Sequence, residues 1–288
     1  MLLCIDCGSA IERVTVERSR LPLAQCQSCD LVQLAEWGAE FDPRLYDYYR
    51  DCQGRATNEI YPLLNQGRNK ATLEALKPRP GHLLDVGCGV GGFVRSALDL
   101  GWRAEGIDLS IQAIEVAQMH DLPCDNVDFF DSRFDDRKYD VIVMTELLEH
   151  VPQPTRFLAR ARQLLGDSGV IYITTPNGNS LSRRLLKGDW RVIHVEHLSY
   201  FTPGRLRQSA RRSGLSVSEM QTANISPITL KRLLRREPVA SVEAARADEQ
   251  VVRAAIQQSR SKRYIKWAVN QTLRFTGTGD SIRVVLTH

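Results

Sequence analysis

A short apolar segment that turns through glycines constrains the fold of this 288-residue chain more than any other feature. The segment Leu83 to Val86 is apolar apart from Asp85. Three glycines follow it with the spacing G-x-G-x-x-G, namely Gly87, Gly89 and Gly92. This pattern predicts a strand that turns tightly into a helix, because glycine lets the backbone approach a nucleotide ligand with no Cβ in between. The spacing alone does not distinguish one nucleotide cofactor from another.

Two acidic residues near this loop indicate which cofactor it accepts. Asp85 lies one residue before the end of the first apolar segment, and Asp108 follows the next one, Arg103 to Ile107. A carboxylate beside the loop repels a pyrophosphate, whereas it attracts a cofactor with an ammonium and a sulfonium group. Asp108 can accept hydrogen bonds from a ribose diol in either case. The charges therefore favour S-adenosylmethionine, and an NAD-dependent oxidoreductase is the alternative.

Apolar and amphipathic stretches alternate along the rest of the chain, which predicts an α/β fold: a parallel sheet with helices on both faces. The expected strands are Leu83 to Val86, Ala104 to Ile107, Val127 to Phe130, Val141 to Thr145, Val170 to Thr174, Leu215 to Glu219 and Ser281 to Thr287. The expected helices are Phe93 to Leu100, Gln112 to Met119, Thr155 to Leu165 and Arg205 to Ser213. The polar motifs follow the strands, at the edge of such a sheet where ligands bind.

These motifs resemble those of class I S-adenosylmethionine-dependent methyltransferases. Asp85 to Gly91 resembles their first motif, and Asp108 resembles their ribose-binding acid. Tyr139 to Met144 and Gly169 to Asn177 resemble their fourth and fifth strands, and Ser281 to Thr287 fits the seventh. The resemblance covers roughly residues 82–222. It implies an enzyme with a Rossmann-like seven-stranded sheet and these cofactor-binding residues: Asp85, Gly87, Gly89, Gly91, Asp108, Asp131, Ser132 and Thr145.

Four of the seven cysteines stand near the N-terminus with the spacing C-x2-C-x18-C-x2-C: Cys4, Cys7, Cys26 and Cys29. Each C-x2-C turn presents two thiolates from one tight loop, and four thiolates form a tetrahedral zinc site. The spacing therefore predicts a zinc ribbon with a structural zinc ion. The other three cysteines are expected to be plain thiols: Cys52, Cys88 and Cys124.

Together these features predict three parts of the chain. Residues 1–36 form the zinc ribbon, and residues 37–80 form a helical linker or an aromatic lid. Residues 81–288 form the S-adenosylmethionine-binding domain, in which residues 223–280 are a helical cap inserted before the last strand.

Two further motifs narrow the resemblance. Glu146 to Val151 (E-L-L-E-H-V) and Glu196 to Thr202 (E-H-L-S-Y-F-T) resemble a branch of methyltransferases that act on small molecules. That branch includes ubiquinone-pathway O-methyltransferases and sugar or polysaccharide methyltransferases with a four-cysteine zinc module in front. The resemblance implies a small-molecule acceptor, and we expect a sugar or sugar-conjugate hydroxyl, such as that of a nucleotide sugar or glycan. Methylation of a carbon or nitrogen atom of the acceptor is the alternative to O-methylation.

A hydroxyl acceptor needs a base that removes its proton, and histidine or glutamate is the usual choice. The catalytic candidates are His197, Glu196 and His150, and a purely structural histidine is the alternative for His197. Thr202 and Pro203 predict the start of a helix after this motif, with threonine as the cap and proline in the first position.

The spacing of Glu146, Glu149 and His150 predicts that their side chains share one face of a helix after the fourth strand. Such a face can hold Mg²⁺ with His197 as a further ligand. The preferred interpretation is that these residues shape the acceptor pocket.

The net charge of +4 is unevenly distributed. The segment Ser226 to His288 has 12 Lys and Arg against 5 Asp and Glu, or +7, so the remainder carries −3. This basic segment is either a solvated helix surface, a site for a phosphate-bearing substrate, or a peripheral contact with anionic lipid. No basic patch interleaved with aromatics surrounds the cysteines, which argues against nucleic acid as a partner. An RNA 2′-O-methyltransferase and a non-catalytic cofactor-binding protein are the remaining alternatives.

The composition, with 43% hydrophobic and 25% charged residues, is that of a globular protein. The sequence shows no signal peptide and no apolar run long enough to span a membrane, so a cytoplasmic location is expected.

Overall fold

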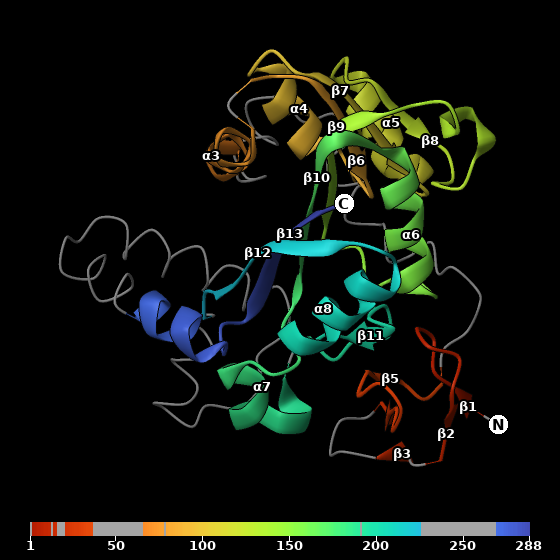
Figure 1. Ribbon diagram of the computed structural model, residues 1–288, viewed down its shortest axis with the longest axis vertical. Helices are drawn as coiled ribbons and strands as arrows, with labels where there is room; N and C mark the ends of the chain where they lie inside the picture. The colour runs from red at the N-terminus through yellow and green to blue at the C-terminus, as the bar shows by residue number, and fades with distance from the viewer. Residues whose placement is uncertain are drawn as a thin grey trace. The chain divides into compact units, whose positions relative to one another are not determined.

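Figure 1 shows the computed structural model of the protein, which describes residues 2–12, 14–15, 21–36, 66–77, 79–190, 192–225 and 269–288. The chain divides into two compact units that alternate along the sequence. Unit 1 comprises Met1–Trp37, Thr175–Leu206 and Met220–Arg283. Unit 2 comprises Gly38–Thr174, Arg207–Glu219 and Val284–His288.

A seven-stranded sheet carries the glycine loop, and its strand order is β12-β13-β10-β9-β6-β7-β8. The strands are β6 (His82–Val86), β7 (Arg103–Asp108), β8 (Cys124–Asn126), β9 (Tyr139–Thr145), β10 (Leu165–Pro176), β12 (Ser216–Ala223) and β13 (Ser281–Thr287). Strands β6 to β10 pair in parallel, and β10, β12 and β13 run from one unit into the other. The predicted α/β fold with a closing strand over Ser281–Thr287 is confirmed.

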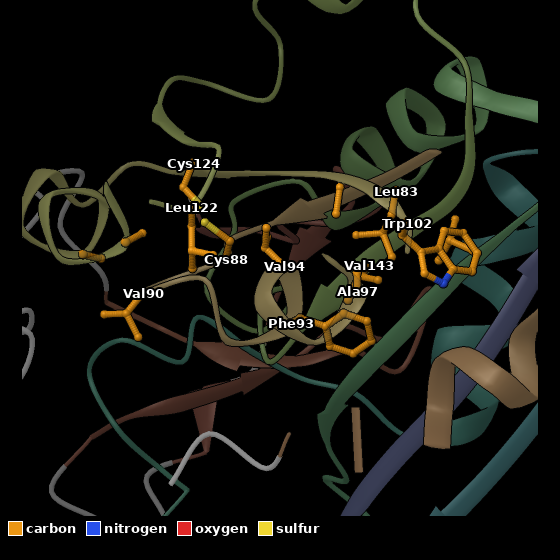
Figure 2. Close-up of a cluster of buried hydrophobic side chains, with 14 of the residues drawn as sticks. Leu83, Cys88, Val90, Phe93, Val94, Ala97, Trp102, Leu122, Cys124 and Val143 are labelled. Atoms are coloured by element: carbon orange, nitrogen blue, oxygen red, sulfur yellow. The ribbon is translucent and has the colours of Figure 1, made fainter. Parts of the chain in front are cut away.

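The central strands β6 and β9 are nearly continuous apolar runs because helices cover the sheet. Helices α3 (Gln66–Leu76), α4 (Gly92–Leu98) and α5 (Ile111–Met119) contribute to one buried cluster with β6, β7 and β9. Figure 2 shows Ala97 of α4 beside Val143 of β9, and Cys88, Leu122 and Cys124 close together in the same cluster. The cluster therefore fixes the strand and the helix on either side of the glycine loop.

Polar caps set the starts of two helices. Ser110 precedes α5, and its Oγ accepts a hydrogen bond from the Ala113 N–H. Thr202 precedes α8 (Pro203–Arg212), and its Oγ1 accepts a hydrogen bond from the Arg205 N–H at 3.2 Å. The helix start predicted at Thr202 and Pro203 is confirmed, since a side-chain oxygen satisfies a free N–H and proline tolerates the first position.

The remaining helical elements are α6 (Pro154–Leu164), α7 (Leu181–Leu186), the short 3₁₀ turns η3 (Ser132–Phe134) and η4 (Lys187–Asp189), and a helix over 269–276.

Unit 1 contains two small sheets around the cysteines. One pairs β1 (Leu2–Leu3) with β2 (Ala10–Ile11), and the other has the order β11-β5-β4-β3. The strands of the second sheet are β3 (Val14–Thr15), β4 (Leu23–Gln25), β5 (Val32–Leu34) and β11 (Ser199–Tyr200). Leu23, Leu34, Trp190 and Tyr200 form its buried cluster. This core is small, so the module has little hydrophobic stabilisation of its own.

The structure corrects two predicted elements. The third strand of the large sheet is β8 (Cys124–Asn126) rather than Val127 to Phe130. It is a short edge strand in which two of the three residues are exposed and polar, so it has no apolar pattern to mark it. The residues after β9 form a turn rather than a helix, and α6 begins only at Pro154.

Several predictions lie outside the described residues. They are residues 37–65 of the predicted linker or lid, Cys52, and residues 226–268 of the predicted helical cap and basic segment. Within the described part of the chain, no helix is both long and apolar enough to cross a membrane.

Candidate functional site

The glycine loop between β6 and α4 has a backbone that only glycine adopts easily. Gly87, Gly89 and Gly91 have φ values of 72°, 52° and 77°, in the left-handed region. The N–H groups of Gly87 and Cys88 donate hydrogen bonds to the Ile107 carbonyl of β7 at 2.8 and 3.0 Å. The loop is therefore held against the neighbouring strand, at the carboxyl end of the sheet where ligands bind in this fold.

We predict that Gly91→Ala destabilises the protein and weakens cofactor binding. A Cβ at this position would lie 2.5 Å from Leu122 Cδ1 and 3.2 Å from Cys124 Sγ. The left-handed backbone adds about 1–2 kcal/mol of strain for alanine. Gly67→Ala is the matched control, because a Cβ there has no neighbour within 4 Å and Gly67 lies in helix α3. Thermal unfolding should show a lower midpoint for Gly91→Ala only; equal midpoints for the two variants would contradict this account of the loop.

Asp85 is an isolated buried carboxyl group at the end of β6. The residue is 2% exposed, and its Oδ1 has no hydrogen-bond partner among the described residues. Burial, with a smaller contribution from the charge of Asp108, raises the pKa of Asp85 to about 8. A buried carboxylate is costly unless a cation or a donor meets it. The geometry therefore fits a ligand that brings a positive group to this loop.

Asp108 at the end of β7 organises the backbone around the loop. Its Oδ2 accepts a hydrogen bond from the Gly89 N–H at 2.9 Å, and its Oδ1 accepts one from the Ser110 N–H at 2.8 Å. Burial raises the pKa of Asp108, while these backbone N–H groups act in the opposite direction. The Leu109 N–H also contributes, and because a carboxylate has about four acceptor positions, Asp108 can still accept a hydrogen bond from a ligand hydroxyl.

Asn126 is a residue of this site that the sequence analysis missed. It ends β8, and its Nδ2 donates a hydrogen bond to the Asp108 carbonyl oxygen at 2.9 Å. The signal available in the sequence was that two polar residues, Asp125 and Asn126, follow apolar ones and mark the end of a strand. The misplaced third strand hid this signal, because it put the strand end at Phe130 instead of Asn126.

Asp131 and Ser132 lie in the loop that follows β8. Asp131 caps η3, and its Oδ1 accepts a hydrogen bond from the Arg133 N–H at 2.8 Å. Ser132 is exposed. The preceding Phe129 and Phe130 pack with Phe157 of α6, at ring-centroid distances of 5.0–5.8 Å. Their role toward an adenine ring stays a prediction, because the contacts of Asp131 in the structure are those of a helix cap.

Thr145 ends β9, paired with Thr174 of β10, and Glu146 follows it. Glu146 has a φ of 51°, and its Oε1 accepts a hydrogen bond from Thr174 Oγ1 at 2.8 Å. Glu149 is 1% exposed, and its ligand atom lies within 4.8 Å of that of His150. In the described part of the chain, Glu146 is not among the acidic, histidine and cysteine side chains that lie close enough to these two to share a metal ion. The geometry therefore gives no support to Mg²⁺ at the full set Glu146, Glu149 and His150, because a turn replaces the helical face expected to align the three side chains.

The four N-terminal cysteines converge in unit 1, and their sulfur atoms all lie within 4.8 Å of one another. Sγ of Cys4 is 3.5 Å from Sγ of Cys29, and Sγ of Cys7 is 3.6 Å from Sγ of Cys26. Four sulfurs at about 2.3 Å from a tetrahedral zinc ion are about 3.8 Å apart, so the set fits zinc.

The two cysteine turns have matching backbones. The Gly8 N–H donates to the Cys4 carbonyl at 2.9 Å, and the Asp30 N–H donates to the Cys26 carbonyl at 2.8 Å. Gly8 and Asp30 both have a positive φ, of 75° and 61°. Glycine adopts this conformation freely and aspartate tolerates it better than most residues, which explains why each turn can close after its second cysteine.

The protonation of the thiols depends on their surroundings. Burial raises the pKa of Cys4 to about 11 and raises that of Cys29 well above its usual range. Burial also opposes ionisation of Cys7, but hydrogen bonds led by those from Ser9 outweigh it and lower its pKa to about 6. Several buried thiolates therefore need a cation to neutralise them.

His197 lies in the loop before β11, and its orientation is defined. Its Nδ1 donates a hydrogen bond to the Val192 carbonyl oxygen at 2.7 Å, since a carbonyl can only accept. Its Nε2 then carries the lone pair. Glu196 lies beside His194 instead, with its Oε2 3.7 Å from His194 Nδ1. Burial raises the pKa of Tyr200 to about 12, so this phenol stays protonated near neutral pH.

The structure thus groups most of the predicted site residues within single units. All eight predicted cofactor residues lie in unit 2 at or after the ends of β6, β7, β8 and β9. His150 also lies in unit 2, whereas Glu196, His197 and the four cysteines lie in unit 1. A shared catalytic role of His150 with Glu196 and His197 stays a prediction.

Comparison with known proteins gives a consistent result. A family model described as a methyltransferase domain matches residues 46–219. A protein of Saccharophagus degradans named ubiquinone biosynthesis O-methyltransferase is 31% identical over 208 residues, which are 66% of this chain and 86% of that protein. A protein of the same name from Thiobacillus denitrificans is 31% identical over 216 residues, or 69% of this chain and 89% of that protein.

Solved structures share the fold at lower identity. An S-adenosylmethionine-dependent methyltransferase of Archaeoglobus fulgidus aligns with a TM-score of 0.55 at 17% identity, covering 85% of this chain and 99% of that one. The [4+2]-cyclase SpnF aligns with a TM-score of 0.50 at 18% identity, covering 76% of this chain and 79% of that one. Because a cyclase shares the fold, the reaction has to be argued from the site.

Proposed function

This chain belongs to the methyltransferase domain family and is an S-adenosylmethionine-dependent methyltransferase, and we propose that its acceptor is a hydroxyl group of a small molecule. When bound, S-adenosylmethionine supplies an electrophilic methyl group on a cationic sulfonium. The names of the relatives support the acceptor, and the observation that supports the cofactor is the buried Asp85 carboxyl, whose Oδ1 has no partner among the described residues at a loop of three left-handed glycines. This site suits a cationic ligand and would repel a pyrophosphate.

On the cofactor side, the residues of unit 2 would bind S-adenosylmethionine and orient it. Asp85 would face the positive groups of the ligand, and Gly87, Gly89 and Gly91 would let it approach the backbone. Asp108 would accept hydrogen bonds from the ribose hydroxyls through its remaining lone pairs. Thr145, Asp131 and Ser132 are proposed to complete this side.

On the acceptor side, His197 is the proposed base. The hydrogen bond from Nδ1 to the Val192 carbonyl fixes the tautomer of the neutral ring, so Nε2 is the nitrogen that would take the proton from an attacking hydroxyl. Alignment of the hydroxyl with the methyl group can supply much of the remaining acceleration. Glu196 and His150 are further candidates for holding the acceptor.

The names of the relatives bear on the class of acceptor. Both relatives described above are named for O-methylation in ubiquinone biosynthesis, which favours a ring hydroxyl of a quinone-type compound. The sugar or sugar-conjugate hydroxyl predicted from the sequence has no support from these names. An acceptor panel should therefore contain a dihydroxybenzoate and a nucleotide sugar, with release of S-adenosylhomocysteine as the measurement.

We also propose that the four cysteines hold a structural zinc ion. The support is the distance between the paired sulfurs, 3.5 and 3.6 Å, which approaches that of a tetrahedral zinc thiolate site. The family model matches residues 46–219, so the cysteine module lies outside the matched region.

His197→Ala is expected to slow methyl transfer by about 10²–10⁴-fold, the range typical for loss of a general base. The affinity for S-adenosylmethionine should stay unchanged. His194→Ala is the control, because it removes an exposed histidine from the same segment. Turnover is measured with whichever compound of the panel is methylated, and cofactor affinity is measured by calorimetry. Full turnover by His197→Ala would remove this residue from the role of base.

A further inference from the structure

The segment that contains His197 forms part of the sheet of the cysteine module. Ser199 of β11 pairs with Gln33 of β5, and Tyr200 pairs with Val32, in antiparallel register. The Leu34 N–H also donates a hydrogen bond to the Leu198 carbonyl at 3.0 Å. The residues directly after the candidate base are therefore held by backbone hydrogen bonds to the strand that follows the second cysteine turn.

Gln33 connects the same strand to the first cysteine turn. Its side chain is fully buried. Its Oε1 accepts a hydrogen bond from the Ile5 N–H at 2.9 Å, and its Nε2 donates one to the Leu3 carbonyl at 3.1 Å. Leu3 and Ile5 flank Cys4, so strand β5 and the first turn cannot move independently.

Arg205 provides the third connection, and it reaches both cysteine turns. The residue lies in the first turn of α8 and is 3% exposed. Its guanidinium forms a buried ion pair with Asp6, which stands between Cys4 and Cys7. Its Nη1 donates a hydrogen bond to the carbonyl oxygen of Cys29 at 3.2 Å.

A buried ion pair is weak evidence for stability alone, because desolvation offsets its attraction. It does specify geometry, since the planar guanidinium has donors in fixed directions. In this protein those donors meet one group from each turn. The same helix begins three residues after Tyr200, so fixing Arg205 also fixes the end of the His197 segment.

We propose that Arg205 is a positioning residue, through which the metal-binding cysteine turns hold the 192–202 segment and the imidazole of His197 in one orientation. The proposal rests on the proposed function for the roles of the metal and of His197. It gives the cysteine module a role on the acceptor side of the enzyme, in addition to stabilising the N-terminal part of the chain.

The first test uses the double variant Asp6→Leu/Arg205→Met in the full chain. Replacing both partners by apolar residues avoids leaving an unpaired buried charge, which alone costs about 3–5 kcal/mol. Zinc content measured by elemental analysis should therefore stay that of the unchanged protein. Hydrogen–deuterium exchange of the peptide 192–202 should become at least about tenfold faster, because hydrogen bonds to a charged group are lost. Exchange of strand β6 (His82–Val86) should not change.

A spectroscopic measurement tests positioning rather than folding. In the unchanged protein, nitrogen NMR of ¹⁵N-labelled histidine should show His197 as a single tautomer with the proton on Nδ1, assigned by its absence from His197→Gln. In the double variant this signal should average between the two tautomers, since the Val192 carbonyl no longer faces a fixed ring.

Arg205→Lys is the second variant, for the case in which the double variant does not fold. Lysine keeps the positive charge near Asp6 but lacks the planar guanidinium group, whose second set of donors also reaches the Cys29 carbonyl. It should shift exchange and the His197 signal in the same direction by a smaller amount. Arg211→Gln is the control, because it removes an exposed arginine from the same helix.

The outcomes separate this inference from the proposed function. A folded variant with unchanged exchange of residues 192–202 and an unchanged His197 tautomer would overturn the role of Arg205. A wild-type protein without zinc would refute the proposed metal site, and the exchange comparison would still decide whether Arg205 holds the segment.

Discussion

Asp85→Asn is expected to weaken the binding of S-adenosylmethionine strongly and, at the same time, to stabilise the cofactor-free protein at alkaline pH. The carboxyl is buried and its Oδ1 lacks a partner among the described residues, so its charge is useful only when a cation is bound. Loss of one partner of a buried charge pair costs about 2 kcal/mol or more, or roughly a thirtyfold weaker affinity.

The pH dependence follows from the pKa of Asp85, which is raised from 3.8 to about 8 by burial. The folded protein thus binds this proton more tightly than the unfolded chain does. Stability of the cofactor-free protein therefore falls as the pH rises from about 4 to about 8, and Asp85→Asn removes this loss. Binding of the cofactor shows the opposite trend, because it requires the ionised carboxylate.

Thermal unfolding with and without ligand at about pH 6 and about pH 8 measures both effects. Asp99→Asn is the control, since it neutralises an acid of the same unit whose side chain is 36% exposed. A parallel titration with S-adenosylhomocysteine, which has the ammonium but no sulfonium, shows which positive group Asp85 meets. An Asp85→Asn variant that binds S-adenosylmethionine as tightly as the unchanged protein would refute the role assigned to this residue.

Removal of zinc is expected to unfold the cysteine module and leave the cofactor site of unit 2 intact. The module has a small apolar cluster, so the proposed zinc ion would supply most of its stability. Structural zinc in small modules contributes about 10–16 kcal/mol of binding free energy at neutral pH. Cys26→Ser removes one ligand whose side chain is fully buried and should release the ion.

Elemental analysis and exchange of residues 21–36 measure this effect, and calorimetry with S-adenosylmethionine checks the other unit. Cys124→Ala is the matched control, because it removes a buried free thiol that lies outside the cysteine group. Full zinc occupancy in Cys26→Ser would show that the four cysteines are not the ligands.

Features that depend on nearby residues could be predicted from the sequence. The glycine loop, the strands β6, β7 and β9 and the cap formed by Thr202 and Pro203 follow from local patterns of apolar residues, glycine and hydroxyl side chains. The C-x2-C pairs likewise indicated a group of four cysteines, and the structure brings their sulfur atoms together.

Features that depend on tertiary contacts could not be predicted. Strand β8 is an exposed edge with the polar residues Asp125 and Asn126, so only its pairing with β7 defines it. The turn after β9 replaced an expected helical face, because Glu146 bonds back to Thr174 of the neighbouring strand. The contact between Arg205 and the Cys29 carbonyl spans 176 residues of sequence, and no local pattern marks it.

The central claim is that the glycine loop with Asp85 binds a cationic methyl donor. Isothermal titration calorimetry of the full chain with S-adenosylmethionine, and separately with NADH, tests it most directly. We predict that S-adenosylmethionine binds and that the affinity rises from about pH 6 to about pH 8 as Asp85 ionises, while NADH gives no binding heat. Tight binding of NADH with no binding of S-adenosylmethionine would contradict the account.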